Sequence, residues 1–153
     1  MIQQLLRQIP LFKDLGDEDL AQLLMIGLVR KHREGATIVK EGVAGHRLHV
    51  ICRGRVRISK MIPEVGEEAL VILDAGDFFG EIEFLDGAPA SASAIAHTAC
   101  ETFSIPHGEL RAMLASRPEL TARFLWVFAE TLAARLRQTD RKLASFLSLG
   151  REP

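Results

Sequence analysis

The residues with the clearest chemical potential lie in one glycine-containing stretch, Gly76–Ala96, which reads GDFFGEIEFLDGAPASASAIA. The pattern predicts a strand end, a glycine turn and a short helix, followed by a loop of small residues that returns to a strand. A glycine turn that leads into a helix N-terminus favours an anion, because the first helical N–H groups have no partner within the helix and the helix dipole attracts negative charge. The stretch therefore predicts a binding site for a small anionic group.

Other chemistry is weaker in this sequence. His46, His49 and Cys52 have a spacing that resembles a metal motif, but alternation along a strand places His49 opposite the other two. We therefore expect no metal site. Glu81 and Asp86 do not share a helical face, and the sequence has no nucleophile elbow, phosphate-binding P-loop or HExxH motif. An enzyme is the least favoured class of function.

Composition indicates one globular domain with a substantial core. The 153 residues are 48% hydrophobic and 25% charged, and the formal net charge of −1 gives no general attraction to nucleic acid or to an anionic membrane. The sequence shows neither a signal-peptide pattern nor an apolar run long enough to span a bilayer. Cys52 and Cys100 lie in apolar runs, so we expect buried, reduced thiols and a cytoplasmic location; a disulfide between them is the alternative.

The elements around the glycine stretch follow from the hydrophobic periodicity. Residues 1–27 predict two short helices that are separated by Ile9-Pro10-Leu11-Phe12. From Leu28 to Ile105, short apolar runs alternate with glycine-bearing turns, which is typical of an antiparallel roll, sandwich or barrel. The fold class predicted is α+β, with a β-roll and helices at both ends.

One predicted strand carries a basic stripe. Within Arg53–Ser59, Val56 and Ile58 fall on one face, whereas the three arginines Arg53, Arg55 and Arg57 fall on the other. The apolar face should line the roll interior. The arginines should lie outside, either as a solvated face or as a surface that docks a partner.

A long helix is predicted at the end of the chain. A short helix over Pro106–Ala115 is followed by a capping-box signature, Ser116-Arg117-Pro118-Glu119, and the helix that it starts should run to about Leu147. One face of this helix carries a continuous apolar stripe: Leu125, Phe128, Leu132, Leu136, Thr139, Leu143 and Phe146. At about 1.5 Å per residue the helix would be about 40 Å long, more than one roll needs to cover it. We expect a homodimer through this helix; the alternative is that the helix folds back over its own roll.

Four motifs in this order resemble a known family. They are IPLF at Ile9–Phe12, EG at Glu41-Gly42, VIxxGxV at Val50–Val56 and GDFFGE at Gly76–Glu81. Together they resemble the cyclic-nucleotide-binding domain of the catabolite-activator superfamily, which also occurs in kinase regulatory subunits and gated channels. The resemblance extends from Leu5 to about Leu147, and it implies a β-roll with N-terminal helices and a long C-terminal helix.

The resemblance also implies roles for individual residues. Glu81 would receive a ribose 2′-hydroxyl, and backbone N–H groups near Gly80 and Ile82 would cradle a cyclic phosphate. Ile58 and Leu70 would flank the base. The segment Ala133–Leu143 is similar to the family's long helix and places Thr139 and Asp140 at the adenine; Thr139 is also the one polar member of the apolar stripe.

The sequence departs from the family pattern at the phosphate. The family has an arginine nine or ten residues after the glutamate, where this chain has Ala90 and Ser91, and no arginine or lysine occurs between Met61 and Ser104. A charge-assisted contact of that kind contributes about 1.5–3 kcal/mol, or about 10–100-fold in affinity. Binding of cyclic AMP with ordinary affinity is therefore not expected.

The second departure is at the end of the chain. In the bacterial activators the long helix leads to a DNA-binding helix-turn-helix, whereas only Ser148–Pro153 follow here, so we expect no nucleic acid to bind this chain alone. We predict one domain over residues 1–150, with helices in 1–27, the roll in 28–105 with its cassette at 76–96, and the long helix at 117–147.

Three functional hypotheses follow from these observations. The first is a regulatory, non-enzymatic module with an atypical cassette, which senses a small ligand or acts through a protein partner. The second is a functional cyclic nucleotide receptor; no other cofactor is expected, and the possible one is the cyclic nucleotide itself. The third is the sensor part of a DNA-binding transcription regulator.

Overall fold

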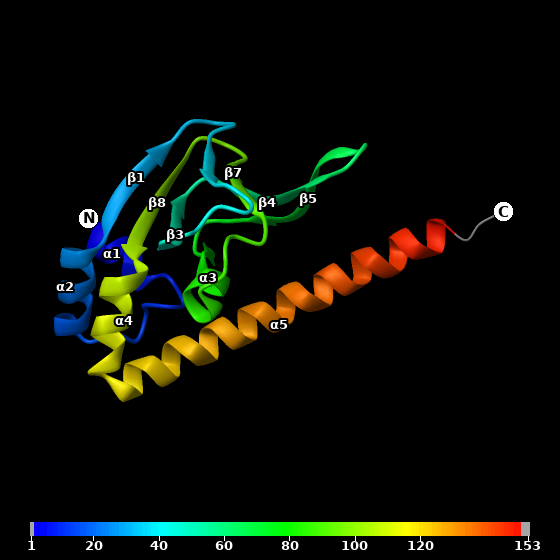
Figure 1. Cartoon of the computed structure of the whole chain (residues 1–153). Helices are drawn as coiled ribbons and strands as arrows, with labels where there is room; N and C mark the ends of the chain where they lie inside the picture. The colour runs from blue at the N-terminus through cyan, green and yellow to red at the C-terminus, as the bar shows by residue number, and fades with distance from the viewer. Residues whose placement is uncertain (1, 151–153) are drawn as a thin grey trace.

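Two four-stranded antiparallel sheets form the roll, and helices lie at both of its chain ends (Figure 1). The computed structural model describes residues 2–150; Met1 of the predicted first helix and residues 151–153 of the predicted tail lie outside them. The helices are α1 (Ile2–Arg7), α2 (Asp17–Ile26), α3 (Glu81–Asp86), α4 (His107–Ala115) and α5 (Pro118–Leu149). The strands are β1 (Leu28–His32), β2 (Thr37–Val39), β3 (Arg47–Arg53), β4 (Val56–Ile62), β5 (Gly66–Leu73), β6 (Phe78–Phe79), β7 (Ser93–Ala96) and β8 (Cys100–Pro106). The predicted α+β roll is confirmed.

The strand order shows that the roll is not a simple meander. One sheet has the order β1-β8-β3-β6 and the other has the order β2-β7-β4-β5, and every pair is antiparallel. Strands that are distant in sequence therefore become neighbours. Residue His49 of β3 is aligned with Ser104 of β8 on one side and with Phe79 of β6 on the other.

Strand β3 separates two hydrophobic cores. Leu48 and Val50 face a large core that the N-terminal helices, α4 and α5 complete, whereas Ile51 belongs to a smaller core between the sheets, with Val56 and Phe79. This division follows from the alternation of side chains along a strand, which makes one central strand apolar on both faces. The cassette starts at the junction of the two cores.

Helix α5 has two different halves. Its first half is packed in the large core through Leu120, Phe124 and Phe128, whose side chains are buried. Beyond Phe128 the helix passes beneath α3 and extends past the roll, in the direction of the β4–β5 hairpin (Figure 1). Leu143 and Phe146 are exposed there.

The predicted capping box does not form at the start of α5. Proline 118 occupies the first turn as expected, but Arg117 is the N-cap and no side chain caps the helix. The hydroxyl of Ser116 donates to the carbonyl of Met113 at 3.0 Å, because the last turn of α4 lies directly before it. The helix also ends at Leu149, two residues later than predicted.

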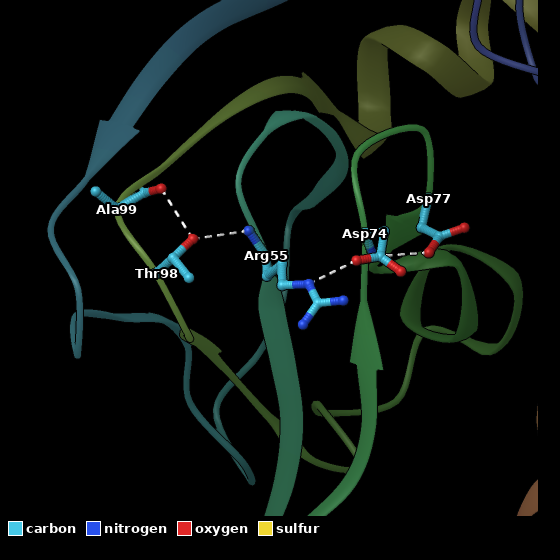
Figure 2. Close-up of polar contacts among 5 residues, drawn as sticks. All are labelled: Arg55, Asp74, Asp77, Thr98 and Ala99. Atoms are coloured by element: carbon cyan, nitrogen blue, oxygen red, sulfur yellow. Dashed lines mark hydrogen bonds and ion pairs between the residues drawn. The ribbon is translucent and has the colours of Figure 1, made fainter.

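The predicted strand Arg53–Ser59 was wrong, because the chain turns there: Arg53 ends β3, Arg55 lies in the turn and Arg57 lies in β4. The three arginines each form an ion pair. Arg55 Nε donates to Asp74 at 2.8 Å, while Thr98 accepts from the Arg55 backbone (Figure 2). Arg57 makes two bonds to Glu67, and Arg53 pairs with Glu101. Each arginine therefore has a carboxylate partner, which removes most of the positive charge that a docking surface would need.

Candidate ligand-binding site

The cassette turn depends on Gly80. This residue lies between β6 and α3 with φ of 95°, a left-handed conformation that residues with a side chain rarely adopt. A Cβ atom built there would lie 2.4 Å from the backbone oxygen of Arg47. His107 Nε2 also lies 3.0 Å from the Gly80 carbonyl oxygen. The turn therefore needs glycine both for its conformation and for its close approach to β3.

A cavity of about 470 Å³ lies between the roll, the cassette and α5. Its walls are mainly apolar, and they come from strands β2, β4 and β5, from the cassette and from the middle of α5. The polar groups that line it are few, among them Glu81, Glu83, Lys60, Arg135 and Thr139. An apolar cavity with a few polar groups is typical of a small-molecule site.

Glu81 is the most deeply buried acid at this cavity. It is 2% exposed, and its Oε1 accepts a hydrogen bond of 2.6 Å from Nη1 of Arg135 on α5. Arg135 also donates to the Phe78 carbonyl, and its guanidinium lies over the Phe78 ring. The ion pair joins the cassette to the long helix across the cavity.

Burial raises the pKa of the Glu81 carboxyl, and the charge of Arg135 opposes that rise. A buried carboxylate is costly without a partner, since desolvation penalises the charged form. Arg135 supplies that partner, so the ion pair offsets part of the cost of burying this carboxylate in a mostly apolar cavity.

Seven of the nine residues predicted for the site line this cavity. They are Gly80, Glu81, Ile82, Ser91, Ile58, Leu70 and Thr139. The structure does not place the other two there. Ala90 is buried, with 3% of its surface exposed, and its backbone forms hydrogen bonds with Val43 and Gly42. Asp140 is exposed on α5 and does not line the cavity. The functional roles of all nine remain predictions.

Two cations at the cavity were missed from the sequence. The range Met61–Ser104 contains no arginine or lysine, but Lys60 lies one residue before it and Arg135 lies on α5. The spacing of Arg135, four residues before Thr139, places both on one helical face and could have indicated it. Lys60 Nζ lies 3.4 Å from Glu41, so both cations already have carboxylate partners.

A second link joins α5 to the roll at the far side of the cavity. The Lys142 ammonium donates to the carbonyls of Ala69 at 3.0 Å and Leu70 at 2.8 Å, both on β5. Leu70 lines the cavity, and so does Thr139, one turn before Lys142. The cavity is thus bounded by two attachments of α5, one to the cassette and one to the hairpin.

Metal sites, membrane-spanning helices and the two cysteines were also considered in the sequence, and the structure describes each of them. Within residues 2–150, no group of three His, Cys, Asp or Glu side chains is arranged to hold a metal ion. None of the helices in that range combines the length and apolar character that crossing a membrane requires. Cys52 and Cys100 are free thiols and lie in different cores.

The family of this fold is identified by comparison with known proteins. The model of the cyclic nucleotide-binding domain matches residues 29–117. The chain is 36% identical over 113 residues to a CRP-like cAMP-activated global transcriptional regulator of Mycobacterium tuberculosis, which covers 74% of this chain and 49% of that protein. It is 32% identical over 134 residues to the cyclic AMP receptor protein of Thermus thermophilus, covering 88% of this chain and 60% of that protein.

Solved structures agree with this result. A cyclic nucleotide-binding domain from Methylobacillus flagellatus superposes with a TM-score of 0.79 at 29% identity, covering 94% of this chain and 82% of that one. The chain spans about half the length of the Mycobacterium regulator and three fifths of the Thermus receptor.

Proposed function

The chain belongs to the cyclic nucleotide-binding domain family, and we propose that it is a non-enzymatic regulatory module with an altered cassette, which senses a small, uncharged, hydroxyl-bearing ligand. The observation that carries this proposal is the Glu81–Arg135 ion pair at the cavity, because it provides a hydroxyl acceptor. Among residues 2–150, both cations that line the cavity are already paired with carboxylates. A buried carboxylate that accepts a hydroxyl proton makes a strong, charge-assisted hydrogen bond.

The missing counter-charge argues against a phosphate-bearing ligand. Ser91, one of the two positions at which the family resemblance implies an arginine, lines the cavity. The two cations at the lining, Lys60 and Arg135, are paired with Glu41 and Glu81. A phosphate in this cavity would have to compete for one of those cations, and it would lie near two carboxylates, Glu81 and Glu83. We therefore expect cyclic nucleotides to bind at least about tenfold more weakly than an arginine-bearing cassette would allow.

A ligand hydroxyl at Glu81 would compete with Arg135 for the same oxygen. Release of Arg135 would loosen the attachment of α5 to the cassette, while the Lys142 bonds to β5 would hold the other attachment. A ligand shifts such an equilibrium only through its different affinity for the two arrangements. Helix α5 is thus the output element of the proposed module.

The partner that we propose for α5 is a second copy of this chain. The exposed apolar residues Leu136, Leu143, Phe146 and Leu147 follow one another at helical spacing beyond the end of the large core. A second copy of α5 would cover this face. The free, buried thiols of Cys52 and Cys100 fit the cytoplasmic location that we include in the proposal.

Calorimetry with matched ligands tests the altered cassette. Adenosine and cyclic AMP share the base and most of the ribose but differ in the phosphate, so the proposal expects adenosine to bind at least as well as cyclic AMP. Ser91→Arg should strengthen cyclic AMP binding by about 10–100-fold and leave adenosine unchanged. Ser91 is the better position than Ala90, since the buried Ala90 side chain leaves no space for an arginine. Ser145→Arg, on the exposed far part of α5, is the charge-matched control.

A second candidate function is an ordinary cyclic nucleotide receptor. It is favoured by Arg135, which offsets the charge of Glu81 and so reduces the repulsion that a phosphate would meet. The Mycobacterium and Thermus relatives are described as cAMP-activated and as a cyclic AMP receptor. A micromolar dissociation constant for cyclic AMP in the wild type, lost in Glu81→Ala, would establish this candidate and overturn the altered cassette.

A further inference from the structure

A second, smaller cavity lies on the other side of the cassette. It measures about 210 Å³ and shares Val39, Gly80 and Glu83 with the larger cavity. Its remaining polar lining comes from β1, from the end of β2 and from the start of β3: Arg30, Lys40, His46, Arg47 and His49. None of the functions considered above uses this cavity.

The charges at this cavity are unbalanced. Three permanent cations, Arg30, Lys40 and Arg47, face one carboxylate, Glu83. Among residues 2–150, none of the three cations forms an ion pair, whereas the outward-facing arginines around the β3–β4 turn are all paired. Glu83 is itself engaged, since it accepts a 3.3 Å hydrogen bond from the Ser91 backbone.

The register of the first sheet explains why Arg30 points toward this cavity. Lys31 of β1 is aligned with Glu101 and pairs with it on the outer face, so the adjacent Arg30 points to the opposite face. Arg30 is aligned with Thr102 of β8, which is in turn aligned with Ile51 of the inner core. The inner face of this sheet is therefore polar at one end of the roll.

His49 gives a second, independent sign of a ligand. His49 is 6% exposed and lines the cavity, and its ring is stacked on Phe79 with the ring centroids 4.8 Å apart. Its Nδ1 is buried and has no hydrogen-bond partner among the described residues. Neighbouring polar groups on the same face are satisfied: Arg47 donates to Ser104 at 3.2 Å, and His32 Nε2 lies 3.0 Å from the Thr102 hydroxyl oxygen. A buried polar atom without a partner is rare in a folded protein.

We propose that this second cavity binds a small dianion, held by Arg30, Lys40 and Arg47 at its mouth and by His49 at its inner end. Guanidinium groups match phosphate and carboxylate oxygens with paired N–H donors, and His49 has one ring N–H to donate. The cavity has less than half the volume of the larger one, which suits a compact group such as phosphate or a short dicarboxylate rather than a nucleotide. The proposal does not depend on what the larger cavity binds.

Amide and imidazole NMR on the full chain tests this site with two probes, inorganic phosphate and malonate, titrated at constant ionic strength in chloride. We expect saturable shifts at residues 30, 40 and 46–49 with one probe or both, and a change at the His49 ring nitrogens when the dianion arrives. The probe that saturates at lower concentration distinguishes phosphate-type from dicarboxylate ligands. Arg47→Gln and Lys40→Gln should each weaken binding by about tenfold or more.

Arg137→Gln is the charge-matched control, because Arg137 is exposed on α5 and distant from the cavity lining. Lys40 is a surface position on the β2–β3 connection, so Lys40→Gln tests the proposal even where Arg47→Gln disturbs β3. Linear, unsaturated shifts with both probes would overturn the proposal. Equal weakening by Arg137→Gln would overturn it as well, since it would show general charge attraction.

Discussion

The ammonium of Lys142 and the carbonyl of Leu70 lie 2.8 Å apart, which fastens the exposed half of α5 to the β4–β5 hairpin. The same ammonium also bonds the Ala69 carbonyl, so one side chain satisfies two acceptors of β5. Beyond this point the helix has only exposed side chains. Within one chain, the order of the last turns of α5 should therefore depend strongly on Lys142.

Replacing Lys142 should loosen this half of the helix. In Lys142→Met we expect faster amide hydrogen exchange in residues 138–149 and in β5, with little change in α1, α2 and β8, because only the local attachment is lost. Arg141→Met is the matched control, since Arg141 is exposed and makes no side-chain hydrogen bond within residues 2–150. Equal exchange rates in the two variants would show that the bonds contribute nothing to order in α5.

The two partners of the Glu81–Arg135 pair should differ in their effect on stability. Arg135→Met leaves the 2% exposed Glu81 without a counter-charge and should lower the free energy of unfolding by about 3 kcal/mol at neutral pH. Glu81→Gln should cost less, because Arg135 is partly exposed and keeps its bond to the Phe78 carbonyl. Urea unfolding of both variants measures the difference.

The pH dependence of Arg135→Met provides a further check. Burial already raises the pKa of Glu81 in the wild type, and loss of Arg135 removes the charge that opposes this rise. The folded variant then takes up a proton more readily than the unfolded chain, so its stability deficit should shrink as the pH falls through the raised pKa. A deficit that grows on acidification would contradict this account.

His49 should make the protein sensitive to acid. Burial, followed by the charges of His32, Arg30, Arg47 and His107, lowers the pKa of His49 to about 3. Between that pH and about 6.5, the unfolded chain binds a proton at His49 that the folded chain does not, so stability should fall by about 1.4 kcal/mol per pH unit as the pH decreases. Above pH 6.5 the effect is absent.

His49→Gln removes this proton uptake and keeps a polar side chain of similar length. The free energy of unfolding of the variant, measured by urea between pH 4 and 8, should decrease less steeply below pH 6.5 than that of the wild type. Parallel curves for the two proteins would show that the His49 imidazole is protonated in the folded state as easily as in the unfolded chain.

The cassette turn should not tolerate a side chain. Gly80→Ala places a Cβ atom 2.4 Å from the Arg47 oxygen at a positive φ, and the unfolding free energy should fall by more than the roughly 1–3 kcal/mol that backbone strain alone costs. Gly87→Ala is the control at the other end of α3, where φ is 70° and nothing lies within 4 Å of the added atom. Thermal unfolding of both isolates the effect of the close approach; equal losses would indicate that β3 moves away freely.

The apolar face of α5 should determine the oligomeric state. We expect a dimer by light scattering for the wild type and a monomer for Leu143→Asp, because the substitution puts a charge on the face that a second copy would cover. Ser145→Asp places the same charge on the opposite side of the helix and should remain dimeric. A monomeric wild type would refute the proposed partner.

The sequence predicted the fold well because its signals are local. Alternation between Leu28 and Ile105, the glycine turns and the long stripe of α5 correspond to observed elements, and Gly80 and Glu81 occupy the expected place in the cassette. The capping box at Ser116 was wrong because a competing local bond forms: the Ser116 hydroxyl donates to the carbonyl of Met113 in the last turn of α4. Short motifs predict an element better than they predict its cap.

The site was predicted less completely because its charges come from distant segments. Arg135 is 54 residues away from Glu81, and no local pattern around the cassette could reveal the pair. The second cavity is harder still, since Arg30, Lys40 and Arg47 become neighbours only when β1, β2 and β3 are assembled in two different sheets. His49 was considered as a metal ligand, and only its stacking on Phe79 and its burial show its true surroundings.

Because the first half of α5 is buried as far as Phe128 and the second half projects, a displaced α5 would pivot as a rigid rod about Phe128. At about 1.5 Å per residue, Arg135 lies about 10 Å along the helix axis from Phe128, and Leu149 lies about 31 Å from it. A sideways movement at Arg135 is therefore magnified roughly threefold at Leu149. The Lys142 bonds to β5 lie on the same projecting half, so the β4–β5 hairpin must either move with the helix or lose these hydrogen bonds.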